Sequence, residues 1–83
     1  MNSGILKAAI LQILKDREDD PAPEKYIMLA LSVQYRIKTT FSELRSIMKD
    51  MDEKGLLVGI HHDDDATLLW GLSIKGKHKA IQL

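Results

Sequence analysis

The spacing of apolar residues changes at Gly55, and this change most constrains the fold of the chain. Before Gly55 apolar residues recur every three or four positions, as they do on one face of an amphipathic helix. After it, Leu56, Val58 and Ile60 alternate with their neighbours, which is the period of a β-strand. The sequence therefore predicts helices first and a sheet afterwards, in a chain of the α+β class.

The first predicted helix runs from Ser3, a plausible N-cap, to about Arg17. Its apolar arc is wider than a stripe that faces only a core, because Ile5 and Leu11 extend it. We expect one part of this arc to face the core and the outer part, around Ile5 and Leu11, to contact a partner chain. A polar connector with two prolines follows over residues 17–23, since proline interrupts a helix.

Two further helices are predicted, over Glu24 to about Arg36 and over Phe41 to Lys54. The former is opened by Pro23 and is apolar almost all round, so we expect it to be the most buried helix. The latter begins with a capping box, in which Thr40 is the N-cap and Glu43 reaches back to it. It ends before a glycine, which is a favourable residue just beyond a helix.

The remaining residues, 56–83, predict a β-hairpin and a short last helix. The hairpin turns at Asp63–Asp65, and the last helix has Ser73 as its N-cap and is weakened by Gly76. Trp70 lies at a period-two position on the return strand. We interpret it as a core or dimer-interface residue rather than as a stacking platform for a base.

Length and composition narrow the possible functions. The 83 residues are enough for one small domain, and we take 1–83 as a single domain. Twelve basic residues balance 12 acidic ones, so no positive field of the whole chain gathers nucleic acid. The absence of cysteine excludes disulfides and thiolate ligands. Without a long apolar run or a secretory signal, we expect a cytoplasmic protein with no membrane partner.

No motif in the sequence favours catalysis or a bound cofactor. A glycine-rich phosphate loop and a helical His–Glu pair are both missing, so we expect the protein not to be an enzyme. The string His61–Asp65 holds imidazoles and carboxylates, which are potential metal ligands. Because adjacent strand residues point to opposite faces, His61 and His62 do not face one ion without a bulge. We interpret the string as a polar turn, with a weak site for a divalent cation or an acidic partner as the alternative.

Two segments, Thr39–Leu57 and Leu72–Ala80, resemble winged-helix regulators. In the first segment, three residues separate Thr40 from Leu44, and Glu53, Gly55 and Leu56 follow further along. The recognition helix of these regulators has the same spacing. The second is similar to the segment after their wing. With the two preceding helices, the resemblance covers nearly the whole chain. It implies a winged helix with three helices, a β-hairpin wing and a short C-terminal helix. A narrower resemblance is to the short stand-alone winged-helix proteins of Mu-like phages and prophages, a group that implies no established activity.

The resemblance implies binding to double-stranded DNA, with the third helix in the major groove. The residues that it places against DNA are Arg36, Lys38, Thr39, Thr40, Ser42, Arg45, Ser46 and Lys49. Within 36–49 four basic residues stand against the single acid Glu43, so the local charge is +3.

The resemblance also places further residues outside the third helix. It puts His61 and His62 on the wing and Lys75, Lys77 and Lys79 on the following segment. The wing departs from the family pattern, because Asp63–Asp65 stands where a basic tip is usual and repels phosphates.

We therefore expect a small winged-helix DNA-binding protein that regulates transcription and acts as a homodimer reading two half-sites. The alternative is a winged-helix protein-interaction module that does not bind DNA, because a fold does not fix a function. The local charge of the third helix favours DNA. The zero net charge and the acidic wing favour a protein partner.

Overall fold

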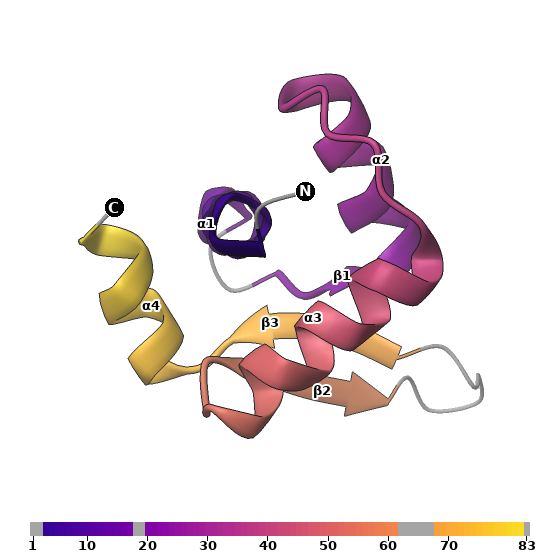
Figure 1. The fold of residues 1–83 in the computed structure, drawn as a ribbon. Helices are drawn as coiled ribbons and strands as arrows, with labels where there is room; N and C mark the ends of the chain where they lie inside the picture. Colours follow the sequence, from indigo (N-terminus) through magenta and orange to yellow (C-terminus); the bar gives the residue numbers. More distant parts are fainter. Residues whose placement is uncertain (1–2, 18–19, 62–67, 83) are drawn as a thin grey trace.

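The computed structural model describes residues 3–17, 20–61 and 68–82 (Figure 1). Within them the helices precede the hairpin and a short helix ends the chain, so the predicted α+β class is confirmed. The elements in chain order are α1 (Ser3–Asp16), β1 (Ala22–Pro23), α2 (Glu24–Gln34), α3 (Phe41–Glu53), β2 (Leu57–His61), β3 (Leu68–Leu72) and α4 (Ile74–Ile81). None of the helices in these ranges is long and apolar enough to cross a membrane.

One strand was not predicted, because it lies in the proline-containing connector. β1 pairs antiparallel with β3, where Ala22 stands opposite Trp70. β2 pairs with the other edge of β3, starting with Leu57 opposite Leu72, so the sheet order is β1-β3-β2. A two-residue strand is too short to show the alternation that marks a strand in sequence. It forms because the edge of β3 offers backbone partners.

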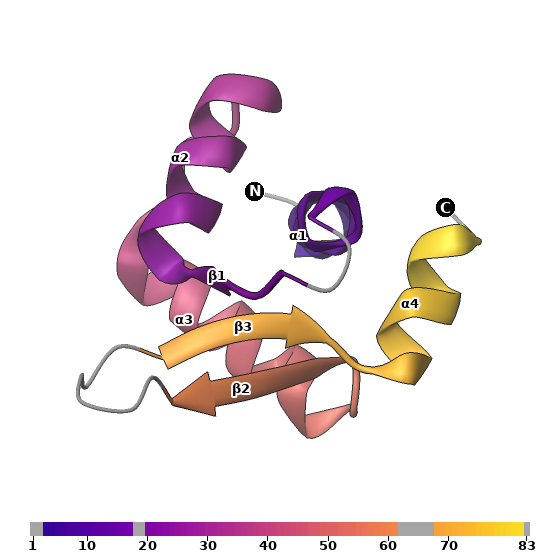
Figure 2. The ribbon, with the colours of Figure 1, turned by 180° about the vertical axis from the view of Figure 1, so that it is seen from behind.

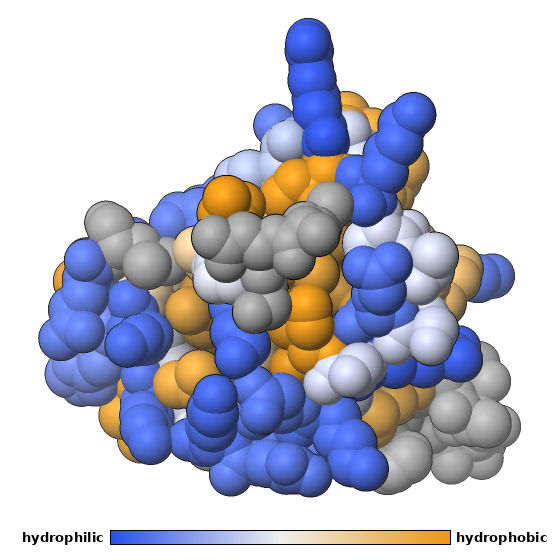
Figure 3. Space-filling model, in the orientation of Figure 1, coloured by the Kyte–Doolittle hydropathy of each residue, from blue (hydrophilic) through white to orange (hydrophobic). Residues whose placement is uncertain are grey.

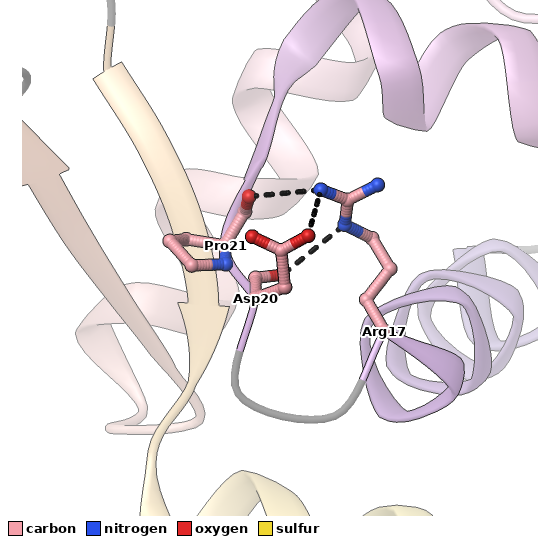
Figure 4. A network of polar contacts seen from close by, with 3 residues as sticks. All are labelled: Arg17, Asp20 and Pro21. Atoms are coloured by element: carbon pink, nitrogen blue, oxygen red, sulfur yellow. Dashed lines mark hydrogen bonds and ion pairs between the residues drawn. The ribbon is translucent and has the colours of Figure 1, made fainter.

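Arg17, at the end of α1, forms hydrogen bonds to the connector (Figure 4). Its Nη2 donates to Asp20 Oδ2 at 2.8 Å and to the carbonyl of Pro21 at 3.2 Å, while its Nε donates to the Asp20 carbonyl at 3.1 Å. The guanidinium also lies 4.2 Å from the centre of the Tyr26 ring on α2. One side chain therefore ties α1, the connector and α2 together just before β1 begins.

The core lies around α1, which runs between α2 and α4 and over the sheet (Figures 1 and 2). Six of its side chains are buried, namely Leu6, Ala9, Ile10, Leu11, Ile13 and Leu14. We predicted α2 to be the most buried helix, and this prediction is wrong. α2 covers only one side of α1. Its Leu29 and Val33 are 62% and 68% exposed.

The wide apolar arc of α1 is satisfied mostly within the chain. Leu11 is only 3% exposed, so the prediction that it contacts a partner chain is wrong. The reason is that α4 packs along α1 in addition to α2, α3 and β3. Ile5 remains 59% exposed. α1 begins at Ser3 itself, so the predicted N-cap lies inside the helix rather than before it.

Both ends of α3 follow from the sequence. The Thr40 hydroxyl accepts a hydrogen bond from the Glu43 backbone N–H at 3.1 Å, which confirms the predicted N-cap. The Glu43 carboxylate does not reach back to Thr40 and instead accepts from the Thr39 hydroxyl at 3.4 Å. At the other end Gly55 has a φ of 77°, the left-handed conformation that favours glycine.

α4 is joined tightly to the turn that follows α3. The Ser73 hydroxyl accepts from the Gly76 N–H at 2.9 Å, as predicted for an N-cap, and donates to the Gly55 carbonyl. We predicted Gly76 to be a weak point of the helix. The structure shows a different role, because a Cβ there would overlap the carbonyl oxygen of Leu56. The missing side chain lets α4 approach the backbone closely.

Candidate nucleic-acid interface

The predicted DNA-contacting residues gather at the start of α3 and in the segment before it. Thr39 is half-buried and the other seven are exposed. This placement follows from the period of α3, because Leu44, Met48 and Met51 are fully buried and direct the opposite face outward. That outward face carries Ser42, Arg45, Ser46 and Lys49.

A left-handed residue shapes the segment between α2 and α3. Arg36 has a φ of 54°, and the next N–H, of Ile37, donates to the Leu31 carbonyl at 2.9 Å. Ile37 packs against the core, while Arg36 and Lys38 on either side of it are exposed. The sequence predicted a short turn between these helices, but positive φ is uncommon for a residue with a side chain, so no local signal predicted the conformation of Arg36.

Arg45 is held by an acidic residue of α2, a contact that sequence reasoning missed. Its Nε lies 2.9 and 3.1 Å from the two carboxylate oxygens of Glu24, and its guanidinium lies 5.7 Å from the centre of the Phe41 ring. The side chain of Arg45 remains 66% exposed. The partners are 21 residues apart, so no helical spacing relates them. With Glu24 beside it, the patch has four basic and two acidic residues.

A groove of about 870 Å³ lies beside this face of α3. The residues that line it are Pro23, Glu24, Lys25, Phe41, Arg45, Lys49, Asp52, Leu68 and Trp70. Its charges have both signs, and its apolar wall comes from Phe41, Leu68 and Trp70. Trp70 is half-buried against the core, so its interpretation as a core residue is confirmed, and its ring also borders the groove.

The structure separates the last helix from the start of α3, and it describes only part of the predicted wing. His61 ends β2, and the predicted turn residues His62 and Asp63–Asp65 lie outside the described residues. Among 3–17, 20–61 and 68–82, no three His, Asp or Glu side chains form a group that could hold a metal ion. Figures 1 and 2 show α4 across α1 from α2. The structure therefore does not bring Lys75 or Lys79 to the start of α3.

Comparisons with known proteins support the fold. No family model matches the sequence, and no curated protein does. Among solved structures the chain is similar to a mutant of ZitR from Lactococcus lactis, with a TM-score of 0.70 and 19% sequence identity. The match covers 93% of this chain but only 47% of the ZitR chain. At this identity the likeness concerns the fold alone, and it confirms the predicted winged helix.

Proposed function

We propose that this protein is a winged-helix DNA-binding protein that regulates transcription, with the start of α3 in the major groove of double-stranded DNA. The observation that carries the proposal is the outward face of α3, where Ser42, Arg45, Ser46 and Lys49 are all exposed. Recognition helices read base edges with their first turns, and arginine pairs with guanine O6 and N7. The buried opposite face of α3 fixes the direction of these side chains.

The segment before α3 supplies contacts to the DNA backbone. Arg36 and Lys38 are exposed on either side of Ile37, which packs against the core. Both can therefore reach phosphates that flank the major groove of the DNA. Thr39 and Thr40 lie at the N-terminus of α3, where backbone N–H groups and the helix dipole favour an anion. The Thr40 oxygen already accepts from the backbone, so its hydroxyl hydrogen is what it offers to a phosphate.

The proposal includes a homodimer, in which two copies of α3 reach successive major grooves. Exposed apolar side chains support self-association, because Ile5 on α1 is 59% exposed and Ile74 and Ile81 on α4 are 78% and 68% exposed. We treat 1–83 as one cytoplasmic domain. The resemblance to proteins of Mu-like phages adds phage origin to the proposal.

The second candidate function is docking of another protein without DNA binding. The groove beside α3 favours it, because Phe41, Leu68 and Trp70 present apolar surface next to charges of both signs. A DNA phosphate backbone is charged and gains nothing from contact with apolar side chains. The core of a protein interface, in contrast, is apolar and rich in aromatic residues. The zero net charge of the chain fits this candidate equally well.

Titration of a random-sequence duplex at several salt concentrations tests the proposal. We expect a mobility shift at about 50 mM salt that weakens steeply towards about 200 mM. At most four basic residues contact phosphates or bases. The slope of log K against log salt should therefore be no steeper than about −4 per protomer. The double variant Arg45→Glu, Lys49→Glu should lose the complex while its far-ultraviolet circular dichroism stays native, because both side chains are exposed.

Lys15→Glu is the matched control, since Lys15 is an exposed lysine in the last turn of α1, away from α3. It should retain most of the DNA affinity. If the wild-type chain gives no shift at low salt, or if the double variant binds as well as the control does, DNA binding through α3 is refuted. Docking of a protein is then the function that the groove supports.

A further inference from the structure

A second cavity of about 570 Å³ lies where α1, the end of α3 and α4 meet. The residues that line it are Lys7, Met51, Lys54, Leu56, Lys75, His78, Lys79 and Gln82. They come from three separate parts of the sequence and share no motif. The tight attachment of α4 to the turn after α3, through Ser73 and Gly76, assembles the cavity.

The cavity carries an excess of positive charge. Four of its lining residues are lysines, and within residues 3–17, 20–61 and 68–82 the carboxylate that pairs with them is Asp50. Asp50 Oδ2 lies 2.7 Å from the Nζ of Lys7 and 3.2 Å from that of Lys54. Lys75 donates to the Lys54 carbonyl at 3.0 Å. No carboxylate in the described part of the chain lies within ion-pair distance of Lys75 or Lys79.

The ion pair of Lys7 and Asp50 favours the charged form of both partners. The hydrogen bond from Lys7 holds the pKa of the Asp50 carboxyl below its usual range, with a second contribution from Lys54. The same hydrogen bond with Asp50 raises the pKa of Lys7. One negative charge therefore offsets only part of the four positive charges.

The inner wall of the cavity is apolar. Met51 is fully buried and Leu56 is half-buried. They lie together because the Leu56 N–H donates to the Met51 carbonyl at 2.9 Å, the closing hydrogen bond of the helix end. Figure 3 shows hydrophilic side chains bordering an apolar patch between α4 and the end of α3. The cavity thus offers cationic groups around an apolar surface.

We propose that this cavity binds a small phosphate monoester that carries an apolar group. A phosphate monoester is close to a dianion at neutral pH, so it would offset about two of the three positive charges that Asp50 leaves uncompensated. Its oxygens would lie among Lys54, Lys75 and Lys79, and its apolar group against the half-buried Leu56. The lining residues include four lysines, and a lysine binds phosphate as a compact point charge with three rotatable donors.

A DNA backbone fits this site less well than a small molecule does. DNA presents phosphates on a convex surface without an apolar group beside them, and the cavity is recessed with an apolar wall. It also lies at the end of α3 opposite Thr40, away from the face proposed to read bases. The inference therefore does not depend on DNA binding by α3.

Titration of the full chain with phenyl phosphate, followed by the backbone amide shifts of the labelled protein, tests the proposal. We expect saturable shifts confined to residues 54–56 and 75–80. Reversal of charge in Lys79→Glu should weaken binding about tenfold, while the Lys15→Glu control stays close to wild type. Lys79 is exposed, so this variant should keep the native circular dichroism spectrum. Inorganic phosphate has the anionic group alone, and phenol has the apolar ring alone. Both should therefore bind more weakly than phenyl phosphate.

Three results would overturn the proposal. One is an absence of saturable shifts at millimolar phenyl phosphate. Another is equal affinity for inorganic phosphate, which would show that the apolar wall takes no part. The third is loss of DNA binding in Lys79→Glu without any binding of phenyl phosphate, which would make the cavity a DNA contact. The DNA titration of the Arg45 and Lys49 variant is independent of all three.

Discussion

At the scale of single residues, the ion pair of Arg45 and Glu24 decides what the face of α3 can do. Glu24 engages the Nε of Arg45 and leaves both terminal Nη groups without a protein partner in the described part of the chain. Those groups are the ones that pair with guanine O6 and N7. Glu24 therefore positions Arg45, and it also places a negative charge close to where phosphates would lie.

The change Glu24→Gln separates these two effects. We expect affinity for random-sequence DNA to rise about twofold to fivefold, because one repulsive charge is removed at an exposed site. Discrimination between DNA sequences should fall, because Arg45 is no longer held by a carboxylate. Fluorescence anisotropy with a random duplex and with a duplex selected from a random pool measures both. Unchanged affinity for the random duplex would contradict the prediction.

Asp50 predicts a pH-dependent stability. Its pKa is lowered in the folded state by hydrogen bonds from Lys7 and then Lys54, relative to an ordinary value of 3.8. A lowered carboxyl pKa stabilises the fold above the unfolded value, and this contribution is lost as pH falls through the folded value. The urea midpoint of wild type should exceed that of Asp50→Asn at pH 7. The gap should close below pH 3.8. If the difference in urea midpoint between wild type and Asp50→Asn does not change with pH, the ionised Asp50 carboxylate is not the source of the stability.

At the scale of elements, α4 depends on one close approach. The Gly76 Cα faces the Leu56 carbonyl oxygen so closely that a Cβ cannot be added without moving α4. The Ser73 N–H donates to the same oxygen at 3.0 Å, so the carbonyl is fixed from two sides. This contact lies behind the lysine cavity, and its loss would open the cavity as well as weaken the helix.

We expect Gly76→Ala to lower the free energy of unfolding by about 3 kcal/mol, at the upper end of the usual cost of overpacking. Gly71→Ala is the matched control, because a Cβ there meets only the Cβ of Pro21, at 3.9 Å. It should change stability by less than about 0.5 kcal/mol. Urea denaturation followed by circular dichroism measures both. Equal effects of the two changes would show that the close approach carries no strain.

At the scale of the whole molecule, the exposed apolar surface bears on assembly. Ile5→Glu should leave folding intact because Ile5 is 59% exposed, but it should weaken self-association at least about tenfold if α1 forms the dimer interface. Leu11→Glu, at a site 3% exposed, should instead unfold the chain. Sedimentation equilibrium and thermal melts distinguish the two variants. A wild-type chain that stays monomeric at every concentration would remove the dimer from the proposed function.

The sequence by itself determined the features that depend on neighbours along the chain. Apolar spacing placed the helices and the hairpin, and the side chains of Thr40 and Ser73 marked the starts of α3 and α4, because caps are local hydrogen bonds. The outward face of α3 followed from the same spacing. Its exposure is now shown, and its contact with DNA is a proposal.

Only the tertiary structure decided which distant residues meet. β1 exists because β3 offers an edge, and Leu11 is buried because α4 packs along α1. Glu24 reaches Arg45 across 21 residues, and the lysine cavity draws on α1, α3 and α4. Such contacts depend on how helices pack in space, and apolar spacing along one helix does not record which neighbour will cover it.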